Sequence, residues 1–262
     1  MLPPYTFIVP TPFYHLQVAV TLQVALDAPD AHGAFLFGNT APDVQTLSGA
    51  ARSATHFFDM PVTQTPRAVL SLLQAHPQLA APGLSSAQRA FVAGYLAHLA
   101  LDELWLREIF QPVFGPQAGW EDFGERLFLH NVLRTYLDER DRALLPAGMA
   151  NLLAAAEPAG WLPFASDTDL CSWRNFLVQQ LQPGATAQTV AVFAQRMGRT
   201  PQEFEALLGS PAALQARIFS RISEAQLAGF QSRAASLCKQ VVNDFFSRNP
   251  TEISSSTRVI NP

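Results

Sequence analysis

A histidine and an aspartate stand one helical turn apart inside an apolar stretch of the sequence. His98 and Asp102 lie in FVAGYLAHLALDELWLREI, residues 91–109. At positions i and i+4 of a helix the two side chains share a face, so an imidazole nitrogen and a carboxylate oxygen can bind one metal ion. The alternative interpretation is a hydrogen-bonded pair in the core. Ligand-type residues upstream favour the metal site.

Three segments upstream carry these further ligand-type residues. His15 begins a predicted helix, where the helix dipole favours the neutral imidazole that binds metals, although a surface or staple histidine is the other interpretation. Asp43 ends the segment GNTAPD, either as a ligand or as an Asx-turn or N-cap aspartate. His56 lies in ATHFFD before two phenylalanines that would bury its surroundings, and Asp59 is the weaker candidate there.

Downstream, His130, Arg134 and Asp138 recur at i, i+4 and i+8 of another predicted helix. A histidine, a cation and an acid on one face can bind a phosphate beside a metal. Arg134 and Asp138 can also form a solvated ion-pair stripe, which has no chemical role. We assign His76 to a helix end before a proline and His32 to a helix end or turn.

The apolar spacing along the chain predicts an all-α fold. Ser85 and Gln88 have the spacing of a capping box, and Pro112 is expected to stop the helix that carries His98. Gly94, one turn before His98, would let another backbone come close. Helices are predicted over residues 12–28, 65–78, 86–111, 119–145, 167–181, 187–197, 201–208 and 211–247.

Composition limits the class of protein. The chain has 262 residues, of which 48% are hydrophobic and 15% charged, and its net charge is −4. These values fit a packed globular protein, and the lack of a basic patch argues against nucleic acid as a partner other than as a substrate. The first Lys or Arg is Arg52, so a secretory signal is not expected. We expect a cytoplasmic protein with two reduced cysteines, Cys171 and Cys238, and no transmembrane segment.

The domain organisation is predicted from the same patterns. Residues 1–160 contain all the ligand-type candidates and are expected to form one helical domain. Residues 161–248 are rich in helix formers, poor in histidine and predicted to pack on that domain as scaffold. A disordered tail is expected over residues 249–262, which read NPTEISSSTRVINP. The oligomeric state is not predicted.

The order of His15, GNTAPD, THFFD and GYLAHLALDE resembles the zinc-dependent phospholipase C family, which is all-α and related to the P1-type nucleases. The resemblance covers roughly residues 14–138. It implies a multi-helix bundle of the phospholipase C/P1 nuclease type, here with additional C-terminal helices. It further implies that Asp43, His56, His98 and Asp102 surround one zinc ion and that Asp102 bridges to a second zinc held by His15.

This sequence departs from the family pattern in two places. The family's second zinc also uses the free amino end of a processed chain, for which this sequence shows no signal peptide. The family's third zinc uses a further histidine and a His-x-x-x-Glu pair. Here His130 is followed at that spacing by Arg134, and Glu108 stands where a histidine is expected. We therefore expect one or two zinc ions, with His130 and Arg134 contacting substrate or a metal ligand.

The chemistry that follows is hydrolysis of a phosphoester. Zinc lowers the pKa of a bound water to about 7, and the resulting hydroxide would attack phosphorus while Asp43 orients or deprotonates it. The expected substrate is a small phosphoester or phospholipid, with phospholipase C-like phosphodiesterase activity. Two alternatives stay open. One is a nuclease-like or nucleotidase-like phosphoesterase, and the other is a degenerate, metal-stapled helical interaction module without activity.

Overall fold

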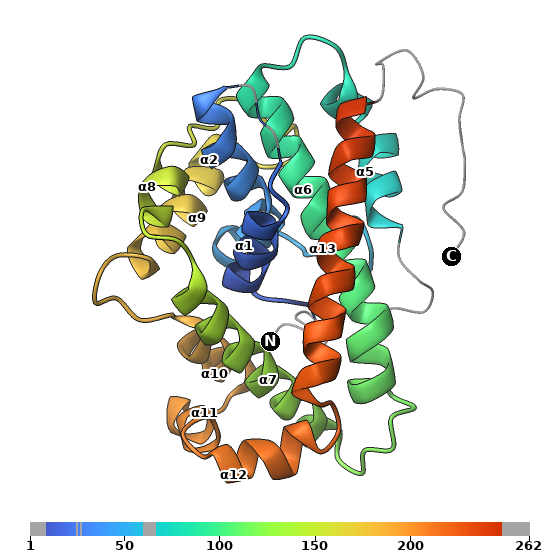
Figure 1. Cartoon of the computed structure of the whole chain (residues 1–262), viewed down its shortest axis with the longest axis vertical. Coiled ribbons are helices and arrows are strands. Elements are labelled where there is room, and N and C mark those ends of the chain that lie inside the picture. Colours follow the sequence, from blue (N-terminus) through green and yellow to red (C-terminus); the bar gives the residue numbers. More distant parts are fainter. Residues whose placement is uncertain (1–8, 25, 27, 60–66, 248–262) are drawn as a thin grey trace.

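The central element of the fold is helix α6 (Ser86–Trp105), which carries His98 and Asp102 (Figure 1). The computed structural model describes residues 9–24, 26, 28–59 and 67–247. Sixteen of the twenty residues of α6 are buried, so neighbouring elements must cover it on almost every side. Ser85 caps its first turn by accepting a hydrogen bond from Gln88 N, which confirms one of the two bonds of the predicted capping box, while the Gln88 side chain donates to Trp161 O instead.

In the described part of the chain there are thirteen α-helices and no strand, which confirms the predicted all-α class. Besides α6 they are α1 (Pro12–Thr21), α2 (Pro29–Gly38), α3 (Gln45–Ser48), α4 (Ser53–His56), α5 (Ala68–Ala75), α7 (Phe123–Leu144), α8 (Met149–Ala154), α9 (Asp167–Gln180), α10 (Thr189–Met197), α11 (Pro201–Leu208), α12 (Pro211–Leu214) and α13 (Glu224–Ser247). Over the same residues, none of the helices combines the length and apolar character needed to cross a bilayer.

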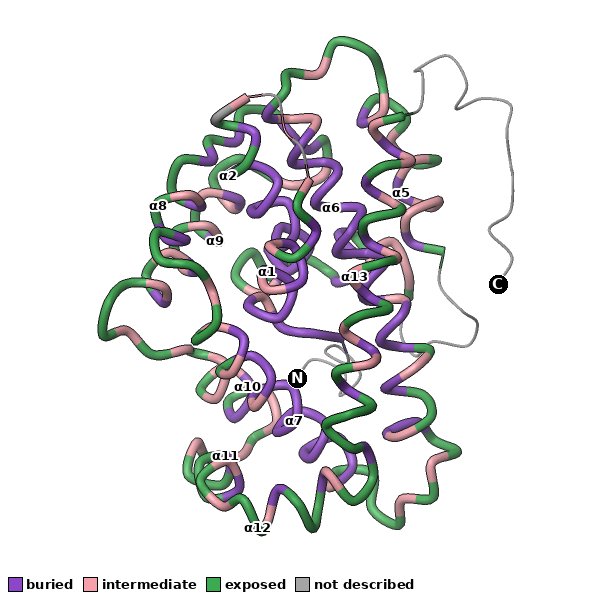
Figure 2. Tube along the Cα trace, in the orientation of Figure 1, coloured by how far each residue is buried: buried purple, intermediate pink, exposed green. Residues whose placement is uncertain are grey.

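Helices from both halves of the chain cover α6. Helix α13 runs beside it, α2 crosses it, and α1 lies between α2 and α7 near the middle of the molecule (Figure 1). The exposed residues lie mainly on the outer faces of these helices and the buried ones face inward (Figure 2). The two predicted parts share this interior, because Trp173 Nε1 of α9 donates to Thr40 O at 2.8 Å. The predicted domain boundary near residue 160 stays a prediction, and the predicted tail lies outside the described residues.

Two glycines allow α2 and α6 to pack in backbone contact. A Cβ atom on Gly94 would collide with the carbonyl oxygen of Phe35, and one on Gly38 would collide with that of Phe91. The close approach predicted at Gly94 is therefore confirmed. It brings the end of α2, with Asn39, directly against the turn of α6 that carries His98.

Several helix ends differ from the prediction for local physical reasons. The predicted helix over residues 12–28 ends at Thr21, because Gln23 has a left-handed φ of 48°. The segment over residues 29–38 is helical, with proline in its first turn. The helix predicted to stop at Pro112 continues to Phe114 as a π-helix, η3 (Leu106–Phe114), which accommodates the proline. The predicted helix over residues 211–247 is broken before α13 begins at Glu224.

Substitution of Gly94 by alanine tests the backbone contact. We expect Gly94→Ala to destabilise the protein by about 1–3 kcal/mol, because the added methyl group must push α2 and α6 apart. The matched control is Gly229→Ala in α13, where the new methyl group meets only the end of the Arg233 side chain. That control should be about 0.5–1 kcal/mol more stable than wild type. Urea denaturation measures the stability of both variants against wild type. Equal stabilities of the two variants would contradict the backbone contact between α2 and α6.

Candidate metal centre

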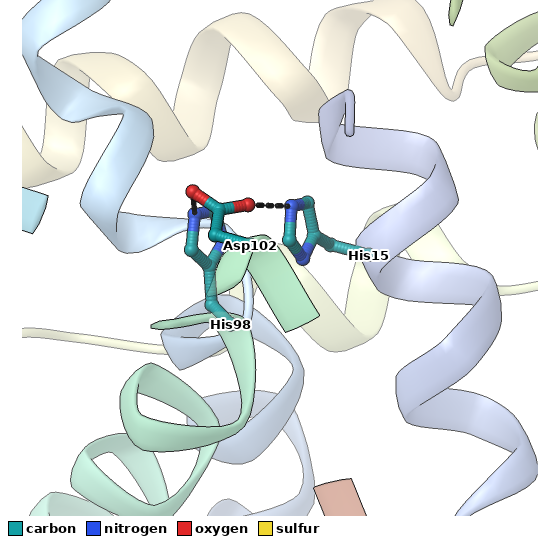
Figure 3. Close-up of side chains that lie close together, drawn as sticks. All are labelled: His15, His98 and Asp102. Atoms are coloured by element: carbon teal, nitrogen blue, oxygen red, sulfur yellow. Dashed lines mark ion pairs between the residues drawn. The ribbon is translucent and has the colours of Figure 1, made fainter. Parts of the chain in front are cut away.

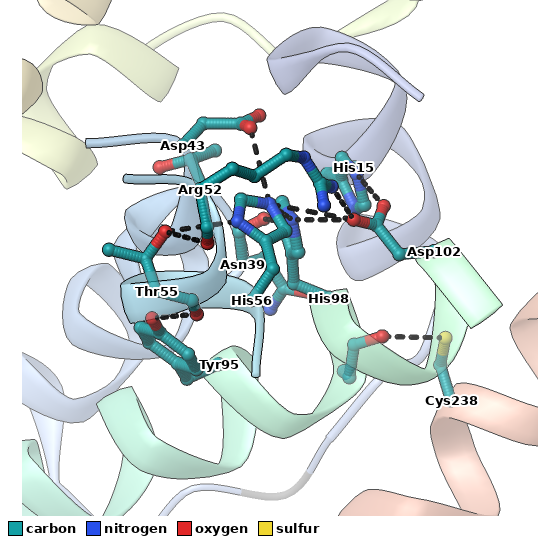
Figure 4. Close-up of polar contacts among 12 residues, drawn as sticks. His15, Asn39, Asp43, Arg52, Thr55, His56, Tyr95, His98, Asp102 and Cys238 are labelled. Atoms are coloured by element: carbon teal, nitrogen blue, oxygen red, sulfur yellow. Dashed lines mark hydrogen bonds and ion pairs between the residues drawn. The ribbon is translucent and has the colours of Figure 1, made fainter. Parts of the chain in front are cut away.

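Four elements bring five of the predicted ligand residues into one buried cluster (Figure 4). Helix α1 supplies His15, α4 supplies His56, and α6 supplies His98 and Asp102. Asp43 lies in the 3-10 helix η1 (Ala41–Val44). The three histidines and Asp102 have no exposed surface, and only 7% of Asp43 is exposed. The fold therefore brings together predicted ligand residues that are up to 87 positions apart in the sequence, from 15 to 102.

The hydrogen bonds of His98 leave one of its nitrogens free to bind a metal. Its Nδ1 lies 2.8 Å from the backbone carbonyl oxygen of Asn39, an acceptor only, so Nδ1 carries the proton. In the neutral imidazole, Nε2 then keeps its lone pair. Such a carbonyl on the opposite nitrogen is the usual way in which proteins orient a metal-binding histidine.

His56 is oriented in the same manner by Thr55. The hydroxyl of Thr55 donates to Arg52 O at 3.2 Å, so it can accept a hydrogen bond from His56 Nδ1, which lies 3.0 Å away. Tyr95 donates to Thr55 O at 2.5 Å and holds this turn against α6. The Nε2 atom of His56 thus also presents its lone pair to the cluster.

Three ligand-type atoms have the spacing of zinc ligands. His56 Nε2 and His98 Nε2 are 3.4 Å apart, and each is 3.5 Å from Asp102 Oδ2. With bonds of about 2.0–2.1 Å, two ligands of a tetrahedral zinc ion are separated by about 3.3–3.4 Å. The triangle of these atoms therefore matches one face of a zinc coordination tetrahedron. Asp43 Oδ1, 3.5 Å from His56 Nε2, is at the distance of a further ligand.

His15 approaches the other oxygen of Asp102 (Figure 3). Its Nε2 is 3.2 Å from Asp102 Oδ1, and its ring stacks on that of His98 with centroids 3.7 Å apart. Among the described residues, His15 Nε2 and Asp102 Oδ1 each lack a hydrogen-bond partner of acceptable geometry. Buried polar atoms without partners are costly, whereas a cation between the two atoms would satisfy both.

The residues present fit one zinc ion and leave donors for a second. Two groups can hold an ion, one made of His15, His98 and Asp102 and the other of Asp43, His56 and His98. Both use His98, whose single available lone pair at Nε2 can serve only one ion. Asp102 directs Oδ1 toward His15 and Oδ2 toward His98. This arrangement is compatible with the bridging role that the sequence resemblance implies.

Arg52 is a member of the cluster that the sequence reasoning did not identify. Its Nη2 donates to Asp102 Oδ2 at 2.8 Å, and its guanidinium lies 4.8 Å from the centre of the Phe58 ring. Only 6% of Arg52 is exposed, so its charge directly offsets that of the buried Asp102. The available signal was its position four residues before His56, which places both on one face of a short helical turn.

The environment sets the protonation state of each ligand. Burial lowers the pKa of His15 and of His56 to about 4, so both are neutral at pH 7 and ready to bind a metal. Burial acts in the same direction on His98, but the charge of Asp102 outweighs it and raises the pKa of His98. Burial would raise the pKa of Asp102, but the nearby imidazoles of His98 and His15 hold it well below its usual value.

Asp43 joins the cluster to a cavity that also contains Arg134 and Asp138. Burial alone would raise the pKa of Asp43, but the nearby imidazoles of His56 and His98 lower it to about 2. The cavity has a volume of about 480 Å³ including its open mouth. The carboxylate is thus ionised where a solvent-accessible space meets the buried ligands.

The structure does not bring His130 into the cluster. Its Nε2 accepts a hydrogen bond from Trp105 Nε1 at 3.2 Å, and its ring lies against Phe110 and Phe114. Burial and the charge of Arg134 hold the pKa of His130 well below its usual value. His130 is therefore a neutral histidine in an aromatic environment.

The remaining histidines and Asp59 lie outside the cluster. His76 caps the end of α5, as predicted, while His32 lies on the exposed side of α2 instead of at a helix end or turn. Asp59 is exposed. Comparisons of the chain with models of known protein families, with curated proteins and with solved structures find no significant match.

Metal content tests the cluster directly. We expect protein purified without chelator to carry one or two zinc ions, and His98→Ala or Asp102→Ala to lose most of that metal, because each removes a ligand. The exposed His32→Ala is the matched control and should keep its zinc. Elemental analysis gives the number of zinc ions per chain. Zinc should raise the melting temperature of wild type but not that of the His98→Ala or Asp102→Ala variant. Full zinc content in a His98→Ala, Asp102→Ala double variant would refute the assignment.

The low pKa of His56 predicts a pH dependence of stability in chelator-treated protein. The folded state excludes a proton from His56 down to about pH 4, whereas the unfolded chain binds one below about pH 6.5. Relative to His56→Gln, which cannot titrate, wild type should lose about 1.4 kcal/mol of stability per pH unit between these values. Denaturation curves at several pH values measure the difference. A constant difference from pH 6.5 to 4 would show that His56 is not buried in its neutral form.

Proposed function

We propose that this protein is a zinc-dependent phosphoester hydrolase of the phospholipase C/P1 nuclease type. The observation that carries the proposal is the triangle of His56 Nε2, His98 Nε2 and Asp102 Oδ2, with sides of 3.4–3.5 Å, next to a carboxylate that opens on a cavity. Neutral imidazoles and carboxylates are zinc ligands, and a structural staple would not need an ionised Asp43 at the cavity. The order of these residues in the sequence supports the same family.

The charges of the cluster favour a reaction on a phosphate ester. Asp43 and Asp102 contribute two negative charges and Arg52 one positive charge. With the histidines neutral, a divalent ion would give the cluster a net positive charge of one. Zinc would supply a water of lowered pKa and a positive charge near the phosphoryl oxygens. An excess of positive charge in a buried site favours the transition state of phosphoryl transfer, in which negative charge gathers on these oxygens.

The side chains of the cluster have distinct tasks in this reaction. His15, His56, His98 and Asp102 would hold the metal, and Thr55 and the Asn39 carbonyl orient two of the imidazoles. Arg52 keeps Asp102 in place and offsets its charge. Asp43 accepts a hydrogen bond from the attacking water and directs its oxygen toward phosphorus. The water adds to phosphorus, the ester P–O bond breaks, and the leaving oxygen takes up a proton. One water is consumed, and the products are an alcohol and a phosphate with one ester bond fewer.

Replacement of Asp43 tests the proposed activity. We expect zinc-loaded wild type to hydrolyse at least one member of a panel of p-nitrophenyl phosphate esters, short-chain phosphatidylcholine and single-stranded nucleic acid. Asp43→Asn should lower the rate by about 10²–10⁴-fold at equal zinc content, because the amide cannot accept the proton or orient the water as the carboxylate does. The matched control is Asp59→Asn, an identical change at a nearby exposed aspartate, which should leave the rate unchanged.

The outcomes of this panel separate the proposed activities. Equal rates for wild type and Asp43→Asn on every substrate would refute the hydrolase and favour a metal-stapled interaction module. Hydrolysis confined to nucleic acid or nucleotides would identify the nuclease branch. Hydrolysis of phosphatidylcholine would identify the phospholipase branch.

A further inference from the structure

The cavity beside Asp43 is formed largely by helices from the C-terminal half of the chain. Helix α9 contributes Trp173 and Phe176, and α10 contributes Phe193 and Arg196. The sequence reasoning treated these helices as scaffold. Residues of these helices instead line the cavity that Asp43 shares.

Two arginines line this cavity together with Asp43. Arg134 comes from α7 and is buried, and Arg196 comes from α10 and is half-buried. The Arg134 Nη1 atom donates to Asn131 Oδ1 at 2.7 Å, and its guanidinium lies 4.4 Å from the centre of the Phe193 ring. These contacts fix the guanidinium from two sides. An arginine held in this way has little freedom to lose when it binds an anion.

We propose that Arg134 and Arg196 bind the phosphoryl group of a small soluble phosphoester in this cavity, beside Asp43. Guanidinium groups match phosphate oxygens in charge and in the geometry of their paired N–H donors. Both guanidinium groups line the same cavity as Asp43, so an anion held between them would lie beside that carboxylate. This inference rests on the proposed function in taking the bound anion as a substrate, but anion binding by the arginines can be measured separately.

The charges around the two arginines support the assignment. Burial lowers the pKa of Arg134 to about 9 and that of Arg196 to about 10, so both remain charged at pH 7. Burial disfavours both cations, Asp43 favours both through its negative charge, and Arg196 further disfavours the charge on Arg134. A metal ion in the cluster beside Asp43 would offset its negative charge. A phosphate would then restore the balance of charge in the cavity.

Asp138, the other acid of the cavity, is occupied by structural hydrogen bonds. Its Oδ1 accepts from Phe13 N at 3.0 Å, and its Oδ2 accepts from the Thr189 hydroxyl. Burial raises the pKa of Asp138 to about 6, which lessens its opposition to a bound anion in mildly acidic solution. Asp138 thus joins α7 to the starts of α1 and α10.

Inorganic phosphate is the probe for this site. Calorimetric titration of the zinc-loaded protein should show one phosphate per chain. Arg134→Gln and Arg196→Gln should each weaken that binding at least tenfold, because each removes a charged donor. Arg199→Gln is the matched control, since Arg199 is close in sequence but forms an ion pair with Glu203 outside the cavity. Because Arg196 is only half-buried, its variant keeps the test valid if the Arg134 variant does not fold.

The results separate this inference from the proposed function. Phosphate affinity unchanged in both arginine variants, at equal zinc content, would overturn the anion site even if Asp43-dependent hydrolysis is present. Arginine-dependent phosphate binding in a protein that neither binds zinc nor hydrolyses the panel would support the anion site and refute the hydrolase. For p-nitrophenyl phosphate, we expect Arg196→Gln to raise KM at least tenfold. Hydrolysis seen only with phospholipid vesicles or nucleic acid would overturn the small-substrate assignment.

Discussion

The burial of the Asp102 carboxylate is the constraint on which the rest of the centre depends. A carboxylate without solvent contact is stable only when cations or hydrogen-bond donors surround it. Arg52 satisfies one oxygen, while His15, His56 and His98 bring imidazoles to within 3.2–3.5 Å of the two oxygens. Apart from His98, which lies on α6 with Asp102, these partners come from α1, α4 and the segment before α4, so the charge of one side chain fixes how several elements meet on α6.

The sequence predicted the cluster because its ligands are chemically distinctive and its central pair is local. His98 and Asp102 are one turn apart on a strongly apolar helix, a relation that helical geometry alone determines. Arg52 was missed because its position one turn before His56 does not by itself show that the fold places it on Asp102. His130 was grouped with Arg134 by spacing, but a helix this buried presents successive turns to different neighbours, here Trp105 in one case and the cavity in the other.

The fold class was also predictable, whereas the positions of the helices were not. Apolar spacing and Ser85 were sufficient for α6, but the contact of α2 with α6 depends on two glycines that are far apart in sequence. The same limit applies to α9 and α10. Their sequences contain aromatic and apolar residues that would suit a core, and only their place in the fold shows that Trp173, Phe176 and Phe193 line a cavity next to Asp43. Tertiary contacts of this kind leave no local signal.

Anomalous diffraction at the zinc absorption edge, on crystals grown without chelator, tests the central claim most directly. The account predicts a peak bounded by His56, His98 and Asp102, with at most one more between His15 and the second oxygen of Asp102. It predicts none beside His130, whose Nε2 is occupied by Trp105. Crystals of zinc-supplemented protein with no peak at the cluster, or with a well-occupied peak beside His130, would contradict it.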